Sequence, residues 1–239
     1  MGTELRDSSL SSHGRSTALL GLILVAIAPT VSIITGFVFK AGLLAVLVFC
    51  ITKVWLFGLP AYWHMKVEGK PFAWSPPKNG GWLVSLGLGI GIILVIIGAY
   101  VLLGEMMIDQ QTLYDLLEPV GLTTPTKLAG AILFWVFINS VLEEYVFRWF
   151  ITSKLEELTG RKWTAVFLSA GIFTFHHTIA LMMFINPLGT FIASLGVFIG
   201  GAIFSWIYLH YRSIWVAWIA HACADVAVFG IAWHLIIGF

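Results

Sequence analysis

The sequence contains an uninterrupted apolar stretch, WLVSLGLGIGIILVIIGAYVLLG at residues 82–104, without a single charged side chain. A helix that crosses a membrane needs about 20 mainly apolar residues, and this stretch is long enough to form one. Six other stretches have a similar length and character, so the chain is expected to cross the bilayer about seven times. The expected spans cover roughly residues 17–39, 41–63, 82–104, 127–152, 163–180, 188–209 and 214–238.

The composition of the whole chain also indicates a membrane protein. Of its 239 residues, 59% are hydrophobic and 10% are charged, whereas soluble domains carry about 25% charged residues. So few charges cannot cover a water-exposed surface, and the high hydrophobicity excludes a disordered chain. A formal net charge of +1 provides no field that would attract nucleic acid. Because lipid cannot pair with exposed backbone polar groups, the expected fold is an all-α polytopic helical bundle.

Short links between neighbouring spans predict antiparallel helices packed as one integrated membrane domain. Its expected parts are an N-terminal tail at residues 1–16, spans and loops at 17–126, and a helical core at 127–239. Lys and Arg gather in alternate loops, which places the N-terminus in the cytoplasm by the positive-inside rule. The basic residues on that side are Arg6, Arg15, Lys66, Lys70, Lys78, Lys154, Arg161, Lys162 and Arg212, and the opposite side carries Lys40, Glu105, Asp109, Asp115 and Glu118.

The second span, at residues 41–63, contains Lys53 in its middle. This segment is therefore expected either to cross fully or to be re-entrant or irregular, with Lys53 snorkelling or capping a turn, and no role is assigned to Lys53. Cys50 and Cys223 both lie in apolar runs, so a disulfide framework is not expected. Five charged residues after the fourth span are expected to form a solvated cytoplasmic face: Lys154, Glu156, Glu157, Arg161 and Lys162.

Ionisable side chains inside three spans are the strongest indication of function. A charge near the middle of a span costs about 2.5–3.5 kcal/mol on insertion scales, so such residues usually mark functional sites. Glu144 and Arg148 are four residues apart, which is the spacing of an intrahelical ion pair. Glu143 lies instead on the face of Asn139, which would support it, and is either available for chemistry or only balances buried charge. The ionisable residues within these spans are Glu143, Glu144, Arg148, His176, His177, His221, Asp225 and His234.

Histidines on the fifth and seventh spans are candidate partners of Glu143. His176 and His177 are adjacent and point in different directions, and their spacing alone does not choose between them. His221 and Asp225 are four residues apart, so Asp225 either orients His221 or forms a self-satisfied structural pair with it. His234, near the outer end of the last span, is expected to belong to the membrane interface.

A glutamate and a neutral histidine in a water-filled intramembrane cavity form a general-base site that activates water. A second histidine on a third helix can donate a hydrogen bond to the oxyanion of a tetrahedral intermediate. The residues therefore predict a peptide-bond hydrolase without a serine or cysteine nucleophile. Two histidines and two carboxylates could also hold Zn²⁺, but the chain has no His-Glu-x-x-His helix, so a metal is not favoured and no cofactor is expected.

Three motifs in this order, Glu143-Glu144-x-x-x-Arg148, Phe173-x-x-x-His177 and His221-x-x-x-Asp225, resemble the CPBP family. This is the type II CAAX prenyl endopeptidase and bacteriocin-processing group, also called Abi, and the resemblance covers about residues 127–239. It implies an all-helical membrane bundle whose catalytic core opens toward the cytoplasmic half. It further implies that Glu143 and His177 activate water, that His221 and the residue at 225 support the oxyanion, and that Glu144 and Arg148 are structural.

The best-known members of that family carry Asn at the position of Asp225. Because an ionised aspartate cannot donate a hydrogen bond to an oxyanion, Asp225 is expected here either to orient His221 or to be protonated. The family resemblance thus leaves the role of Asp225 open between these two.

The expected partners are the lipid bilayer and a membrane-anchored protein or peptide substrate, such as a leader or a C-terminal tail. The resemblance implies prenylated CAAX tails only for eukaryotic members. Short loops suggest a prokaryotic cytoplasmic membrane. Two other classes of function stay open: a non-catalytic immunity or scaffold protein that binds a peptide in the same cavity, and a proton-coupled transporter. The transporter would require an internal repeat and helices broken in corresponding halves, and neither is visible in the sequence.

Overall fold

The computed structural model describes residues 12–39 and 42–238, and over these ranges it consists of helices and loops without strands. The predicted all-α fold is confirmed, and seven helical segments are long and apolar enough to cross a membrane. The tail predicted at residues 1–16 lies mostly outside the described residues, as do Arg6 and Lys40.

The first two spans form a helical hairpin. Pro29 lies in the first turn of α2, and because proline lacks a backbone N–H, the first span bends there. Lys53 does not interrupt the second span, which is helical from Leu43 to Val67 and long enough to cross the membrane, with a π-helical last turn. The elements of this hairpin are α1 (Ser12–Ala26), α2 (Ala28–Ile33) and the π-helix η1 (Ile34–Val38), followed by α3 (Leu43–Tyr62) and the π-helix η2 (Trp63–Val67).

The third span is the single helix α4 (Trp82–Met107). A short segment then lies at the end of the bundle, formed by α5 (Gln110–Leu117) and the 3-10 helix η3 (Glu118–Val120). Asp109 starts α5 as its cap, since its side chain accepts a hydrogen bond from the backbone N–H of Thr112 at 2.9 Å.

The fourth span is 35 residues long and changes its helical pitch along its length. Two π-helical stretches interrupt it, and the second contains a hydrogen bond from Oγ1 of Thr152 to the carbonyl of Phe147, five residues earlier, at 2.7 Å. The span ends where Gly160 adopts a φ of +66°, a conformation that favours glycine. Its segments are α6 (Pro125–Phe134), η4 (Trp135–Asn139), α7 (Ser140–Glu143), η5 (Glu144–Thr152) and α8 (Ser153–Thr159).

The last three spans are α9 (Lys162–Leu181), α10 (Pro187–Tyr211) and α11 (Ile214–Ile237). Helix α10 packs along α9, and α11 packs along α4. The approach of α4 to α11 is close, because a Cβ added to Gly89 would lie 2.8 Å from the Cβ of Cys223. A small residue at this point lets the two helices pack at short range.

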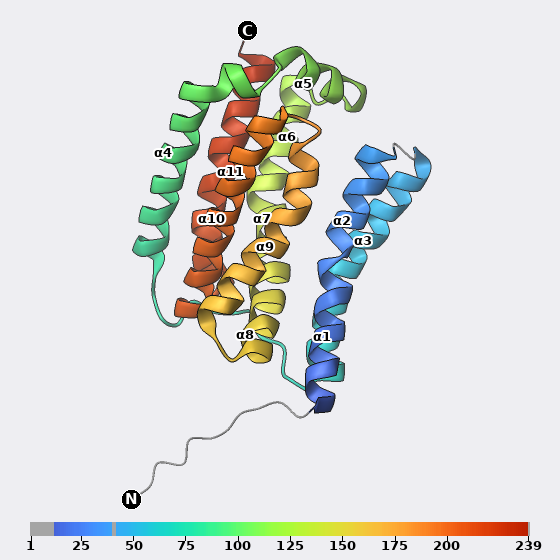
Figure 1. The fold of residues 1–239 in the computed structure, drawn as a ribbon, viewed down its shortest axis with the longest axis vertical. Coiled ribbons are helices and arrows are strands. Elements are labelled where there is room, and N and C mark those ends of the chain that lie inside the picture. The colour runs from blue at the N-terminus through green and yellow to red at the C-terminus, as the bar shows by residue number, and fades with distance from the viewer. Residues whose placement is uncertain (1–11, 40–41, 239) are drawn as a thin grey trace, which may run out of the picture.

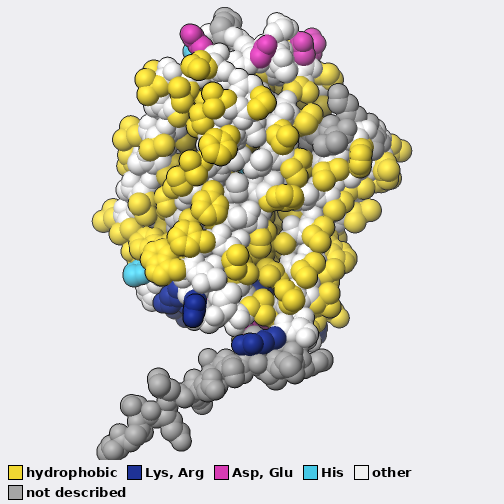
Figure 2. Space-filling view, in the orientation of Figure 1, with side chains coloured by type: hydrophobic (Ala, Val, Ile, Leu, Met, Phe, Trp, Pro, Cys, Tyr) yellow, Lys and Arg dark blue, Asp and Glu magenta, His cyan; other side chains and the backbone are white. Residues whose placement is uncertain are grey.

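Helices α1, α2 and α3 stand together to one side of the other helices (Figure 1) and contact α8, α9 and η5. The core between the remaining helices is apolar and tightly closed, with Phe150, Ile151, Ile207 and Val216 each at most 1% exposed. On the face that Figure 2 shows, apolar side chains cover the flanks, the visible Lys and Arg lie at one end and the visible Asp and Glu at the other. This surface suits a protein whose flanks face lipid.

The start of α11 is fixed by the loop that precedes α4. Ser75 accepts a hydrogen bond from the backbone N–H of Ile214 at 3.1 Å, and its carbonyl accepts one from the hydroxyl of Ser213 at 2.7 Å. Further along, the hydroxyl of Ser85 on α4 donates to the carbonyl of Val216 and accepts from the N–H of Ala220 at 3.2 Å. These bonds set the height and rotation of α11 in the bundle.

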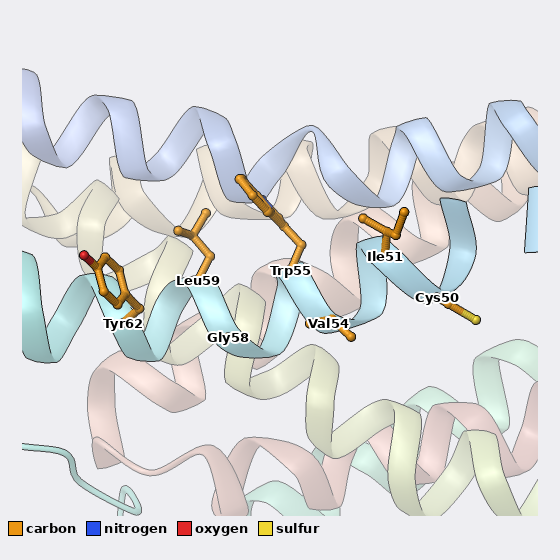
Figure 3. Close-up of a pocket in the computed structure, with 7 residues that line it drawn as sticks. All are labelled: Cys50, Ile51, Val54, Trp55, Gly58, Leu59 and Tyr62. Atoms are coloured by element: carbon orange, nitrogen blue, oxygen red, sulfur yellow. The ribbon is translucent and has the colours of Figure 1, made fainter. Parts of the chain in front are cut away.

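A groove of about 600 Å³ opens on α3 (Figure 3). It is an apolar surface of a single helix, and side chains such as Ile51 and Val54 are more than half exposed. None of the residues that line it belongs to the acidic and histidine cluster of the sequence analysis. Its lining consists of Cys50, Ile51, Val54, Trp55, Gly58, Leu59 and Tyr62.

Candidate active site

The fourth span carries four of the predicted site residues within ten positions. Glu143 ends α7 and Glu144 begins the π-helix η5, so the helix widens between the two glutamates. The side-chain Nδ2 of Asn139 donates to Oε1 of Glu143 at 2.7 Å, as expected for residues on one helix face. Glu144 and Arg148 are fully buried.

Glu144 and Arg148 form the predicted intrahelical ion pair, with Nε of Arg148 3.5 Å from Oε1 of Glu144. The guanidinium also lies over three aromatic rings, at 4.5 Å from Phe173, 5.2 Å from Phe204 and 5.9 Å from Phe147. Ring faces attract a cation, and they replace part of the water that this buried charge has lost.

His221 on α11 is the point at which acidic side chains of the fourth span and of α11 meet. Its Nδ1 lies 2.8 Å from Oε1 of Glu144, and its Nε2 lies 3.6 Å from Oε2 of Glu143 and 3.8 Å from Oδ1 of Asp225. The ring stacks on Phe204 at 4.9 Å between centroids. Both ring nitrogens therefore face carboxylates, and three acidic side chains surround one imidazole.

The shortest contact to His221 comes from Glu144 and not from Asp225. The sequence offered Asp225 as the orienting partner because it lies one turn away on the same helix. In the structure that one-turn spacing places Asp225 at 3.8 Å, whereas Glu144 reaches Nδ1 at hydrogen-bond distance from another helix. Glu144 thus contacts His221 as well as Arg148.

His177 lies beside this cluster on α9. Its Nδ1 is 2.8 Å from the carbonyl of Phe173, which can only accept, so Nδ1 carries the proton and Nε2 of the neutral ring is an acceptor. The ring of Phe173 contacts both histidines, with centroid distances of 4.3 Å to His177 and 5.9 Å to His221. Among the described residues, no hydrogen bond or ion pair joins His177 to Glu143, whose charge acts on the imidazole through space.

The other two histidines of these spans occupy different environments. His176 is 6% exposed and its ring stacks on Phe147 at 5.2 Å, so it packs in the interior. His234 lies near the end of α11 against the ring of Tyr100, away from the cluster. The cluster around His221 therefore includes neither.

Lys53 also reaches the site, a contact that its spacing in the sequence does not indicate. Its Nζ donates to Oδ1 of Asn139 at 3.0 Å. A charge in the middle of a span was the signal that could have drawn attention to it, but its partner is 86 residues away in sequence. Such a contact depends on how α3 is rotated, which spacing does not reveal.

The fit of the site to a metal ion can be judged from its donors. Within residues 12–39 and 42–238, no three side chains of His, Cys, Asp or Glu are arranged to hold one metal ion together. Each nitrogen of His221 already faces a carboxylate. The donor arrangement does not fit a zinc site, and no step of the mechanism below involves a metal.

The basic end of the molecule is not simply a solvated face, which corrects the prediction for Lys154. Lys154 is 3% exposed, and its Nζ lies 2.5 Å from Glu68 and 2.8 Å from Glu157. Lys70 completes this group at 3.0 Å from Glu68. Partial burial alone would lower the pKa of Lys70, but its hydrogen bond to Glu68 and the charges of Glu157 and Glu68 raise it above the ordinary value.

A second ion pair at the same end joins Arg212, in the turn between α10 and α11, to Glu156 on α8. Both terminal nitrogens of Arg212 donate to the carboxylate, at 2.6 and 2.8 Å. This hydrogen bonding raises the pKa of the guanidinium. Cys50 and Cys223 are both free thiols, in agreement with their apolar surroundings in sequence.

Comparison with known proteins gives one match. Residues 125–227 match the model of a family described as type II CAAX prenyl endopeptidase Rce1-like. The match confirms the resemblance to the CPBP group and includes the whole fourth span, α9, α10 and the part of α11 that carries His221 and Asp225. Neither the search of curated proteins nor that of solved structures gave a match.

Proposed function

Because residues 125–227 match the Rce1-like family of type II CAAX prenyl endopeptidases, we propose that the chain is an intramembrane endopeptidase. Its substrate is a membrane-anchored protein or peptide in which it hydrolyses one peptide bond. The observation that carries the proposal is the convergence of Glu143, Glu144 and Asp225 on His221 inside a bundle of membrane-spanning helices. Buried ionisable groups are costly in a membrane, and a set drawn from two helices and facing one imidazole is best explained by chemistry.

Glu143 and His177 activate the attacking water in this proposal. The ionised carboxylate of Glu143 removes a proton from water, and Nε2 of His177, the acceptor left by the hydrogen bond to Phe173, holds the same water. The water oxygen bonds to the carbonyl carbon and forms a tetrahedral intermediate. When the carbon–nitrogen bond breaks, the proton passes from Glu143 to the leaving amine.

His221 supports the oxyanion of that intermediate. With its Nδ1–H directed to Glu144, the imidazole needs a second proton on Nε2 before it can donate from there. The carboxylates of Glu143 and Asp225 flank Nε2 and stabilise that charged ring. Asp225 thus acts on His221 by its charge, where better-known members carry an amide.

The charges and the family match also support a proposal for the orientation and the substrate. The end that carries Lys66, Lys78 and Arg161 faces the cytoplasm, so the N-terminus is cytoplasmic, in what we take to be a prokaryotic plasma membrane. A substrate held by a lipid or an apolar tail would reach the site from the bilayer or from this face. Prenylated CAAX tails, leaders and other anchored tails all meet that requirement.

The experiment that tests this function is peptide cleavage in proteoliposomes. The probes are an internally quenched peptide with a farnesylated cysteine in a C-terminal CAAX sequence, and the same peptide anchored by a palmitoyl chain instead. Wild type is expected to cleave at least one probe with and without chelator, whereas Glu143→Ala is expected to lose cleavage and stay folded. Glu105→Ala removes an exposed carboxylate at the other end of the molecule and serves as the control.

Three results would contradict the proposal in part or in whole. Equal rates for Glu143→Ala and wild type would end the assignment of Glu143 as the base. Loss of cleavage on chelation with recovery in Zn²⁺ would replace it with a metal site. Absence of cleavage with every probe, together with retention of the intact peptide by the purified protein, would favour a non-catalytic peptide binder.

A further inference from the structure

Lys53 is linked to Glu143 by a chain of two hydrogen bonds. Its Nζ donates to Oδ1 of Asn139 at 3.0 Å, and Nδ2 of Asn139 donates to Oε1 of Glu143 at 2.7 Å. An ammonium group can only donate, so Asn139 must turn its oxygen to Lys53 and its NH₂ to Glu143. The lysine therefore fixes which way the amide faces, and the amide fixes the carboxylate.

The hydrogen bond alone does not explain why this residue carries a charge. A neutral donor of similar length could bond to Asn139 without the cost of about 2.5–3.5 kcal/mol for a charge inside a span. A long lysine side chain can also extend toward the lipid headgroups, but that of Lys53 turns inward to Asn139. The positive charge is therefore held inside the bundle, beside Asn139.

The charges that face Glu143 indicate a role for this positive charge. Glu144 and Asp225 are acidic and oppose a negative charge on Glu143, and Arg148 is already paired with Glu144. Lys53 interacts with the charge of Glu143, and within the described part of the chain it makes no ion pair with another carboxylate. The titratable groups around Glu143 are Lys53 from α3, His177 from α9, His221 and Asp225 from α11, and Glu144 and Arg148 from its own helix.

We propose that Lys53 is a positioning residue that, through Asn139, holds the carboxylate of Glu143 in place and keeps it ionised for proton abstraction from water. This inference rests on the proposed function, in which Glu143 is the base. It brings the second span, which lies outside the matched family region, into the catalytic arrangement.

The pH profile of kcat/KM on a cleaved probe peptide tests this role. Lys53→Gln keeps a donor for Asn139 but removes the charge, so ionisation of Glu143 requires a higher pH. The acidic limb of the pH profile is expected to move up by about one pH unit. The value of kcat/KM then falls roughly tenfold at pH values below the limb and stays nearly unchanged at pH values above it. Lys53→Arg is expected to restore the wild-type limb. Lys66→Gln, which removes an exposed lysine near the end of the same span, is expected to leave the profile unchanged.

A second measurement does not depend on cleavage. Dicyclohexylcarbodiimide reacts with protonated carboxyl groups in apolar surroundings, and mass spectrometry locates the adduct. In Lys53→Gln, half-labelling of Glu143 is expected at a pH about one unit higher than in wild type, even if no probe peptide is a substrate. Lys53→Met, which is uncharged and apolar, is expected to shift labelling in the same direction and covers the case in which Lys53→Gln does not fold.

The two readouts separate this inference from the proposed function. An unchanged acidic limb and unchanged labelling in folded Lys53→Gln would overturn the role of Lys53 while leaving the peptidase intact. A uniform loss of kcat/KM at every pH, without a shift of the limb, would also overturn it, because that is the effect of a merely structural residue. A labelling shift in a protein that cleaves nothing would support the role of Lys53 and count against the peptidase.

Discussion

Nδ1 of His221 lies 2.8 Å from Oε1 of Glu144, although the two residues are 77 positions apart and lie on different helices. The opposite edge of the same ring faces Glu143 at 3.6 Å. Neighbouring side chains on an α-helix diverge by about 100°, so two adjacent glutamates cannot face one edge of a ring together. Here they face its two edges, and Glu144 orients the imidazole while Glu143 remains beside Nε2.

Arg148→Met is expected to destabilise the protein by about 3–5 kcal/mol, because it leaves the buried carboxylate of Glu144 without its counter-charge. Thermal unfolding in detergent, followed by the fraction that stays monodisperse, measures this loss. Arg161→Met removes an exposed arginine and is expected to change stability by at most about 1 kcal/mol. If the two variants were equally stable, the ion pair with Glu144 would have no structural role.

His177→Ala is expected to lower the cleavage rate by about 10²–10⁴-fold, because it removes the acceptor that holds the attacking water. His176→Phe is the matched variant on the adjacent position. Since His176 is stacked on Phe147 in the interior, a phenyl ring should replace it with a change of rate below about threefold. Both rates are measured with the same probe peptide. A larger loss of rate in His176→Phe than in His177→Ala would transfer the catalytic assignment to His176.

Lys154→Met is expected to destabilise the protein by about 3–5 kcal/mol, since Glu68 and Glu157 would lose a buried partner. Lys70→Met, which changes the exposed lysine of the same group, should cost about 0–1 kcal/mol. Chemical unfolding of wild type and both variants measures these losses of stability. Equal losses in the two variants would show that the burial of Lys154 does not strengthen its ion pairs.

The ion pairs of Lys70 also predict how the stability of the protein depends on pH. The raised pKa of Lys70 means that its contribution is fully present below the ordinary lysine pKa. It is lost only as the pH rises through the higher value in the folded protein. The stability difference between wild type and Lys70→Met should therefore not change between pH 6 and pH 9, and a difference that disappears within this range would contradict the ion pairs of Lys70.

Gly89→Ala is expected to destabilise the bundle by about 1–3 kcal/mol, because the new methyl group would overlap with Cys223 on α11. Gly91→Ala, two residues further along α4, meets no atom within 4 Å. That change should be neutral or stabilising by up to about 1 kcal/mol, since alanine favours a helix more than glycine does. Equal effects on the unfolding temperature would mean that α4 and α11 do not pack as described.

Sequence was sufficient for the features that depend on local geometry. Apolar runs of about 20 residues predicted all seven spans, because a helix needs about that length to cross a bilayer. The pairing of Glu144 with Arg148 followed from one helical turn, as did the placement of Asn139 beside Glu143. The family match agrees with the three motifs that those turns contain.

Features that depend on the rotation of one helix against another were missed. Lys53 was left without a role, and Glu144 was expected to meet only Arg148, because nothing in the spacing says which face of α3 or α11 turns toward the fourth span. Lys154 was expected in solvent, since its partner Glu68 lies just after a different span. In each case the deciding contact joins residues far apart in sequence, and only the assembled bundle defines it.

The π-helical segment that begins at Glu144 makes the site sensitive to chain length as well as to residue identity. A π-helix closes its hydrogen bonds over five residues and an α-helix over four, so each wide turn accommodates an additional residue. Removal of one apolar residue from η5 (Glu144–Thr152) would allow the segment to rewind as an α-helix and would turn α8 relative to the glutamates. Such a deletion leaves every ionisable side chain in the sequence. It would nevertheless separate the two ends of the fourth span from the residues that they contact.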